Sequence, residues 1–225
     1  MKKITLLITV ICVFYSCKEV NLEMELPDGN TYYFENPQPI NDRELKSIPT
    51  KFHGLYMNSD SVYININRNV ITVDLLSKFK ISNMDLDSLK VDFDISNNEI
   101  ISKKEKVKFS YRKLKDSIEV ADKDTDTIFN FSDSQKMKRV NGNLVISKKD
   151  SIYWKIKLLT FNEKSLVLKQ LYAEEDLNKI DSITKIKAKK IDSITYIITP
   201  TRAEFKQFFK LKDFGHDIEF KRIKS

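Results

Sequence analysis

The sequence contains few of the residues on which catalysis, metal binding and covalent cross-linking depend. Its 225 residues include two cysteines, two histidines and four glycines. Cys12 and Cys17 both lie near the start, so the rest of the chain has no disulfide and must fold around an apolar core alone. The scarcity of glycine argues against a phosphate-binding loop, a collagen-like repeat or a glycine-rich linker.

The familiar catalytic patterns are missing as well. His53 and His216 are far apart in the sequence, neither belongs to an H-E-x-x-H pair, and no serine lies in a G-x-S-x-G elbow. Aspartate and glutamate are so abundant that no one pair of carboxylates is distinguished. We therefore expect no enzymatic activity and no cofactor, and an enzyme of an unrecognised type is the minority alternative.

One acidic stretch matches part of the sequence pattern of a calcium-binding loop. Asp122, Asp124 and Asp126 have the D-x-D-x-D spacing, and Asp133 falls at the twelfth place. Such a loop needs glycine at its sixth place, where this chain has Thr127. We expect an acidic hairpin turn here and no bound metal.

The N-terminus has the zones of a secretory signal. Lys2 and Lys3 precede residues 4–14, which are apolar except for two threonines. Because a transmembrane helix needs about 20 apolar residues, this run is too short to span a bilayer. It predicts a signal peptide over residues 1–16.

The residues after the apolar run resemble the lipobox of bacterial lipoproteins, especially those of the Bacteroidota. Phe14-Tyr15-Ser16-Cys17 has a small residue directly before the cysteine. The resemblance implies acylation of Cys17 and attachment to a lipid bilayer, in which each buried methylene contributes about 0.8 kcal/mol. Lys18, rather than aspartate, implies sorting to the outer membrane, with the periplasmic or cell-surface face left open. The alternative is an ordinary signal peptide in which Cys17 has no role.

The charge of the mature chain is only mildly positive. Removing residues 1–16 leaves 209 of the 225 residues, in which 37 basic side chains oppose 32 acidic ones. No concentrated basic arm is present. This composition does not indicate a nucleic-acid partner.

Proline divides the mature chain into two parts. Four of the five prolines lie before residue 50, at positions 27, 37, 39 and 49. We expect residues 17–50 to be a tether that follows the lipidated cysteine, in which residues 42–47 could form a short helix. The folded domain is then expected over residues 51–225.

Alternating apolar residues dominate the domain. This period of two occurs in residues 62–66, 107–111 and 152–158, where Ile152, Trp154, Ile156 and Leu158 are expected on one buried face. Residues 139–144 carry Asn-Gly between two short apolar runs, which predicts a two-residue hairpin. We predict a mainly antiparallel β domain, either a barrel or a sandwich.

Two helices and a last strand are expected near the C-terminus. Residues 173–180 begin with acidic side chains, which favour a helix start. Thr201 and Glu204 have the spacing of a capping box, and Phe205 and two further phenylalanines share one face of the helix that follows. Residues 218–220 then alternate as a final strand.

The dipeptide Asp-Ser followed by valine, leucine or isoleucine occurs six times, beginning at residues 60, 87, 116, 150, 181 and 192. Because aspartate and serine favour turns and the residue that follows favours strands, the pattern predicts turns that lead into strands. A repeated two-strand unit and simple compositional bias both remain open as its origin.

Two groups of lysines are predicted to lie on strand faces. Lys185, Lys187 and Lys189 alternate, as do Lys155 and Lys157. Brought together they would form a basic stripe for anionic glycans or lipid headgroups. The alternative is a solvated sheet face on which lysine discourages edge pairing.

Two family resemblances concern the mature domain. Residues 54–56, ahead of the first hairpins, together with a helix before a final strand, loosely resemble the lipocalin layout. Residues 34–39, 54–56 and 199–204 resemble uncharacterised Bacteroidota lipoproteins, a resemblance that implies no activity. The expected function is therefore non-catalytic binding or assembly with an envelope protein, and the alternative is a carrier of a small apolar ligand or lipid. The residues that would bind either partner are unknown.

Overall fold

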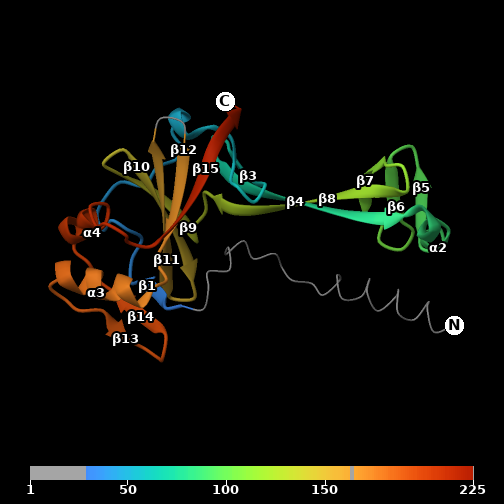
Figure 1. Cartoon of the computed structure of the whole chain (residues 1–225). Helices are drawn as coiled ribbons and strands as arrows, with labels where there is room; N and C mark the ends of the chain where they lie inside the picture. Colours follow the sequence, from blue (N-terminus) through green and yellow to red (C-terminus); the bar gives the residue numbers. More distant parts are fainter. Residues whose placement is uncertain (1–28, 163–164, 225) are drawn as a thin grey trace.

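A computed structural model describes residues 29–162 and 165–224 of the chain (Figure 1). The expected signal peptide, residues 1–16, and Cys17 lie outside the described residues. The predicted mainly β fold class is confirmed, and antiparallel pairing dominates. The sheet is a single one and is not closed, with the strand order β13-β14-β1-β11-β12-β15-β2-β3-β4-β8-β7-β6-β5, and β9 and β10 join it at β11.

The strands of the first half are β1 (Thr31–Phe34), β2 (Gly54–Met57), β3 (Val62–Ile66), β4 (Val70–Ser82), β5 (Phe93–Ser96), β6 (Glu99–Ser102), β7 (Lys108–Lys113) and β8 (Ser117–Asn130). Those of the second half are β9 (Gln135–Val140), β10 (Asn143–Asp150), β11 (Tyr153–Asn162), β12 (Ser165–Gln170), β13 (Lys189–Lys190), β14 (Thr195–Ile198) and β15 (His216–Lys224). The helices are α2 (Leu86–Leu89), α3 (Glu174–Ile183), α4 (Arg202–Phe208) and two 3-10 turns, η1 (Thr50–Phe52) and η2 (Asn83–Asp85).

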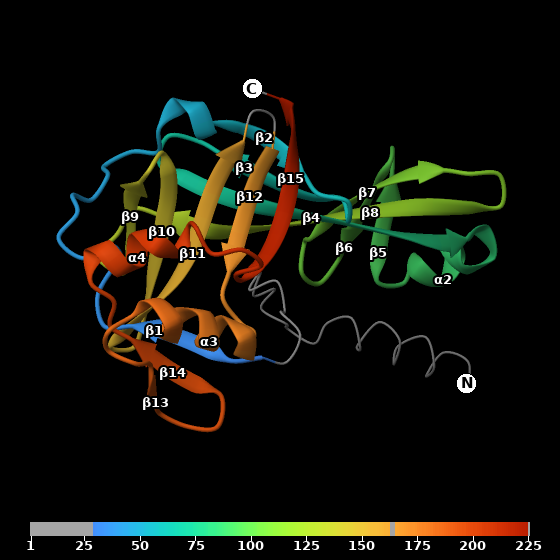
Figure 2. The ribbon, with the colours of Figure 1, turned by 60° about the vertical axis from the view of Figure 1, so that its left-hand side comes forward.

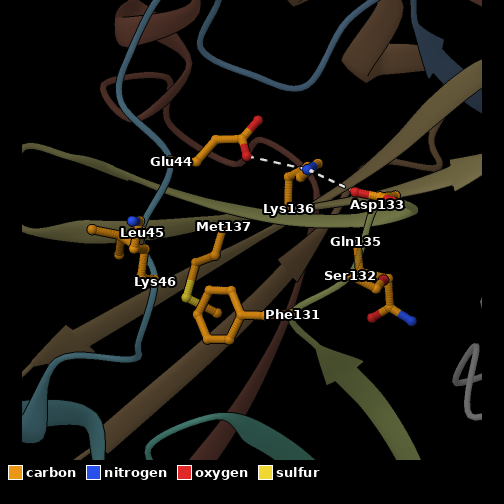
Figure 3. Close-up of a pocket in the computed structure, with 9 residues that line it drawn as sticks. All are labelled: Glu44, Leu45, Lys46, Phe131, Ser132, Asp133, Gln135, Lys136 and Met137. Carbon is orange, nitrogen blue, oxygen red and sulfur yellow. Dashed lines mark ion pairs between the residues drawn. The ribbon is translucent and has the colours of Figure 1, made fainter.

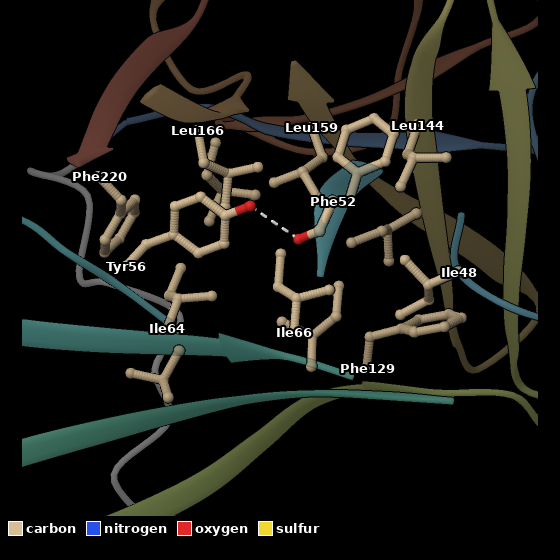
Figure 4. Packing of buried hydrophobic residues seen from close by; sticks show 14 of the residues in the cluster. Ile48, Phe52, Tyr56, Ile64, Ile66, Phe129, Leu144, Leu159, Leu166 and Phe220 are labelled. Atoms are coloured by element: carbon tan, nitrogen blue, oxygen red, sulfur yellow. Dashed lines mark hydrogen bonds between the residues drawn. The ribbon is translucent and has the colours of Figure 1, made fainter. Parts of the chain in front are cut away.

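Most of the sheet curls around a core of aliphatic and aromatic side chains. Strands β2, β3, β4, β8, β9, β10, β11, β12 and β15 all contribute to it. Figure 4 shows Phe52, Tyr56, Leu159 and Phe129 filling the interior, and the hydroxyl group of Tyr56 donates a 2.8 Å hydrogen bond to the carbonyl oxygen of Phe52. The curled sheet therefore encloses packed side chains.

A second core lies on the other face of β10 and β11. There Val145, Trp154 and Ile156 pack with residues of β1, β14, α3 and α4. Both predicted C-terminal helices are confirmed, and the capping box of α4 forms, with Thr201 and Glu204 exchanging hydrogen bonds. Because both faces of β10 and β11 are covered, their sequences contain adjacent apolar residues as well as alternating ones.

Residues 29–50 are not a tether, which corrects the predicted domain boundary at residue 51. β1 pairs with β14 and β11, and Tyr32 and Phe34 are buried in the second core. The expected helix over residues 42–47 does not form. Instead, the backbone N–H groups of Leu45 and Ile48 donate 2.8 Å hydrogen bonds to the carbonyl oxygens of Met137 on β9 and Arg68 in the β3–β4 turn. Residues 35–50, which we call the seam segment, thus lie along the open edge of the curled sheet, between β9 and the β3–β4 turn.

The Asn-Gly hairpin is confirmed. Val140 and Asn143 are paired across the β9–β10 turn, and the φ angles of Asn141 and Gly142 are 49° and 84°. A two-residue turn of this type requires positive φ at both central positions, which asparagine and glycine tolerate best.

Strands β4 and β8 extend beyond the rest of the sheet and carry a second, smaller unit (Figures 1 and 2). β3 pairs with β4 as far as Leu75, and β7 pairs with β8 only from Ala121 toward its start. Between these limits Leu76 and Ser77 pair with Lys123 and Asp122, and no third strand flanks them among the described residues. We call these four residues the neck, residues 78–121 the lobe, and the remaining described residues the body.

Three further predictions are wrong. Ile152 is 70% exposed because it lies in the β10–β11 turn rather than in β11, whereas Trp154 is buried as expected. Residues 185–188 are a loop, so Lys185, Lys187 and Lys189 do not share a strand face. Of the Asp-Ser pairs, those at 60, 116, 150 and 192 precede strands as predicted, but those at 87 and 181 lie within α2 and α3.

Candidate functional site

Each of the two histidines makes a contact that stabilises the fold. Nε2 of His53 lies 2.9 Å from the carbonyl oxygen of Ile48, a contact that holds the seam segment against β2. The ring of His216 meets Tyr172 edge to face, with 5.7 Å between the centroids. The structure does not bring these two histidines to a common site, because His53 lies ahead of β2 while His216 begins β15 at the end remote from the β2 pairing.

The acidic stretch from Asp122 to Asp126 is part of strand β8 and not a hairpin turn, contrary to prediction. Its alternate residues Asp122, Asp124 and Asp126 pair with Ser77, Leu75 and Val73 of β4. In a strand, alternate side chains are about 7 Å apart along one face, so these carboxylates do not converge on one point. Among the described residues no group of three histidine, cysteine, aspartate or glutamate side chains is placed to hold a metal ion.

An open hollow of about 290 Å³ lies where the seam segment crosses β9 (Figure 3). Lys136 lies between two carboxylates, 3.3 Å from Glu44 and 3.9 Å from Asp133. Figure 3 shows these two acids on either side of the ammonium group. Three of the four charged groups that line the hollow, those of Glu44, Asp133 and Lys136, are thus paired with one another.

Lys138, a buried residue of β9, holds the seam segment against the sheet. Lys138 donates hydrogen bonds of 3.0 and 2.8 Å to the carbonyl oxygens of Pro37 and Pro39. Desolvation lowers the pKa of Lys138, and the nearby carboxylates of Glu44 and Asp42 oppose that shift. Both carbonyl groups belong to the proline-rich stretch that was expected to be a tether, so this contact is structural.

A small polar cluster surrounds Asp150 at the end of β10, with Tyr33 from β1 and Lys155 from β11. The hydroxyl group of Tyr33 donates a 2.7 Å hydrogen bond to Asp150, and Lys155 lies 3.2 Å from the same carboxylate and over the ring of Tyr33. The hydrogen bond from Tyr33 is the main cause of a lowered pKa of Asp150, and burial raises the pKa of Tyr33. The ring of Tyr153 lies 5.9 Å from that of Tyr33.

The lobe has a thin core and an apolar surface. Its buried apolar residues are Ile100, Tyr111, Ile118 and Val120, packed against half-buried neighbours from β4, β5, β7 and α2. The exposed large apolar side chains of the lobe are Phe79, Met84, Val91 and Val107, of which Met84 is 88% and Val91 72% exposed. The exposure of these four was missed in the sequence: Phe79, Met84 and Val91 belong to no alternating run that was identified, and Val107 begins the run over residues 107–111 but lies outside β7.

Charge is also unevenly distributed in the lobe. Residues 103–115, which cover β7 and its two turns, hold seven basic side chains and one acidic one. Residues 85–99, which cover α2 and β5, hold five acidic side chains and one basic one. In the sheet β6 lies between the basic strand β7 and the acidic strand β5, and Lys103 of the basic stretch lies 3.8 Å from Asp94 of the acidic one. Apolar groups beside charges of both signs are typical of a protein-binding surface.

Comparison with known proteins gives no relative: neither a family model, nor a curated protein, nor a solved structure matches the chain. Within the described part of the chain, no helix has the length and apolar character needed to cross a membrane.

Proposed function

We propose that the protein is an outer-membrane lipoprotein, anchored through Cys17, whose lobe binds a protein partner in the cell envelope without catalysing a reaction. The observation that supports this most is the placement of the lobe at the end of two strands, outside the packed body. An element in that position adds nothing to the cores of the body. Its exposed apolar and charged side chains are therefore available for another molecule.

The apolar surface of the lobe supports a protein partner. Single exposed apolar residues are common on soluble proteins, but the lobe carries four large ones although it is a small unit. Covering a large apolar side chain contributes roughly 1.5–3 kcal/mol. Burial of Met84 and Val91 alone would be enough for a measurable contribution to binding.

The alternative, a carrier of a small apolar ligand, has less support. A carrier needs space inside the curled sheet, and that space is occupied by Phe52, Tyr56, Phe129 and their neighbours (Figure 4). The surface of the lobe therefore supports a docking role better than the interior of the body supports a carrier role.

Photo-cross-linking in intact cells tests the partner. A photoreactive residue at Met84 or Val91 should give one discrete cross-linked protein species, and the same residue at Lys212, which is exposed on the body, should not. Replacing residues 78–121 with Asn-Gly, so that Ser77 and Asp122 flank a tight turn, should leave the body folded and abolish partner binding. Equal cross-linking from Lys212, or none from the lobe, would refute the proposal.

The anchor is tested separately. The Cys17→Ala chain should lose its acyl label and its recovery with the outer membrane at high salt. Digestion of intact cells with a protease then distinguishes the cell-surface face from the periplasmic face. A Cys17→Ala chain that is still acylated would exclude Cys17 as the anchor.

A further inference from the structure

The loop and hairpin that contain β13 combine positive charge with exposed isoleucine. Residues 185–194 hold Lys185, Lys187, Lys189 and Lys190, together with Ile186, Ile191 and Ile194, all three of which are exposed. The tip residue Ile194 is 52% exposed. None of the ion pairs found among residues 29–162 and 165–224 uses these four ammonium groups, so the segment is basic as well as apolar.

The only carboxylate of the segment is directed into its own turn. Oδ1 of Asp192 accepts hydrogen bonds of 3.0 and 2.8 Å from the backbone N–H groups of Ile194 and Thr195. This arrangement fixes the turn and leaves the side chain of Ile194 facing outward. The segment is also attached firmly to the body, since Lys189 and Lys190 pair with Ile197 and Tyr196 of β14.

The start of the described chain lies directly beside this hairpin. The backbone N–H group of Thr31 donates a 2.8 Å hydrogen bond to the carbonyl oxygen of Ile194, and β1 then runs parallel to β14. Thirteen peptide steps separate Cys17 from Asn30. At about 3.5 Å for each step, they place the hairpin at most about 45 Å from the cysteine.

Figures 1 and 2 both show the β13–β14 hairpin at the end of the body remote from the lobe. The basic isoleucine hairpin and the start of β1 lie at the end of the molecule that is closest to Cys17 along the chain. In a protein anchored through Cys17, this end would face the membrane. The lobe then projects away from the bilayer.

We propose that residues 185–194 rest on an anionic phospholipid surface, with Ile186, Ile191 and Ile194 in the interfacial layer and the lysines on headgroup phosphates. Lysine stems can lie along an apolar surface while the ammonium groups reach the polar layer. A lipid chain combined with a basic patch binds membranes more firmly than either alone. The inference rests on the proposed lipid anchor, and it adds the orientation of the anchored protein.

The test uses the mature-length chain, residues 17–225, with Cys17→Ala, so that no acyl group contributes. This chain should co-sediment with vesicles of phosphatidylethanolamine and phosphatidylglycerol, and much less with phosphatidylcholine vesicles. Binding should weaken as salt is raised, because salt screens exposed charges. Absence of binding to the anionic vesicles would overturn the inference.

Two variants locate the surface. Changing the four lysines of residues 185–190 to glutamine should weaken vesicle binding about tenfold or more, since each lysine near an anionic surface contributes substantially. The matched control changes Lys103, Lys104, Lys106 and Lys108 of the lobe to glutamine and should bind like the parent chain. An equal loss in the control would mean that binding follows net charge alone, and the inference would fail.

A third variant reports insertion directly. Ile194→Trp should show a blue-shifted emission on addition of anionic vesicles, above the constant signal of buried Trp154. An unchanged spectrum would show that the tip stays in water, which contradicts the inference. The vesicle assays and the acyl-label assay test the two proposals separately. If Cys17 is not acylated, the hairpin should still bind vesicles. If the hairpin does not bind vesicles, the parent chain should still carry its acyl label.

Discussion

Lys138 of β9 donates a 2.8 Å hydrogen bond to the carbonyl oxygen of Pro39, which lies 99 residues earlier in the chain. The same ammonium group also binds the carbonyl oxygen of Pro37. A buried lysine is thus one of the polar attachments between β9 and the seam segment, beside the Leu45–Met137 backbone hydrogen bond and the Lys136–Glu44 ion pair.

Replacing Lys138 should therefore destabilise the whole body. Lys138→Met keeps the length of the side chain but leaves two carbonyl groups without their donor, and each buried unsatisfied group costs about 1–3 kcal/mol. In urea unfolding, the free energy of unfolding of the Lys138→Met protein should be lower than that of the parent protein by an amount in this range. Lys136→Met, on the same strand but partly exposed, should cost less than about 1 kcal/mol. Equal effects of the two substitutions would show that the contact with the prolines is unimportant.

Trp154 and Ile152 form a matched pair for testing the second core. Trp154 is 8% exposed and packs in this core, so Trp154→Ala should lower the free energy of unfolding by about 3–5 kcal/mol. Ile152→Ala, two residues earlier and exposed, should change it by less than about 0.5 kcal/mol. A native tryptophan emission typical of water would contradict this placement.

The Tyr33–Asp150 hydrogen bond predicts an acid-dependent contribution to stability. Because the pKa of Asp150 is lowered in the folded protein, its contribution is fully present above the unfolded value of about 3.9 and is lost as the pH falls from there through the lowered folded value. Tyr33→Phe should cost about 1 kcal/mol at pH 7 and less at the lowest pH at which the protein remains folded. Tyr153→Phe, in the neighbouring ring, is the control and should show no such pH dependence. An equal cost of Tyr33→Phe at both pH values would exclude the carboxylate as the partner that matters.

Calcium should not stabilise the protein. The carboxylates of Asp122, Asp124 and Asp126 are spread along strand β8, whereas calcium requires its oxygen ligands within 2.3–2.6 Å. Thermal unfolding should be unchanged by millimolar calcium. A higher melting temperature that disappears in Asp124→Ala would contradict this expectation.

The sequence predicted those features that depend on neighbouring residues. The Asn141-Gly142 turn and the capping box between Thr201 and Glu204 are local, and each formed at the expected position. The alternation in β3 and in β11 from Trp154 onward also identified buried faces correctly.

The features that were missed depend on distant contacts. Tyr32 and Phe34 are buried because β11 and β14, more than a hundred residues later, pair with β1, and the nearby prolines concealed that strand. Asp87 and Asp181 begin the same dipeptide as Asp60, yet Asp87 and Asp181 lie in helices. The surrounding residues, rather than the dipeptide, determine the secondary structure there. In the lobe, alternation marked only residues 107–111 at β7, and the exposed apolar side chains outside that strand gave no such signal.

The neck also limits how the distance between lobe and body can vary. Side chains alternate along a strand, so adding two residues to each of β4 and β8 at the neck would move the lobe outward by about 7 Å with its faces unchanged. Adding one residue to each would instead exchange the two faces of the lobe's sheet relative to the body. Length variants that still present the same surface to a partner should therefore differ by even numbers of residues in both strands.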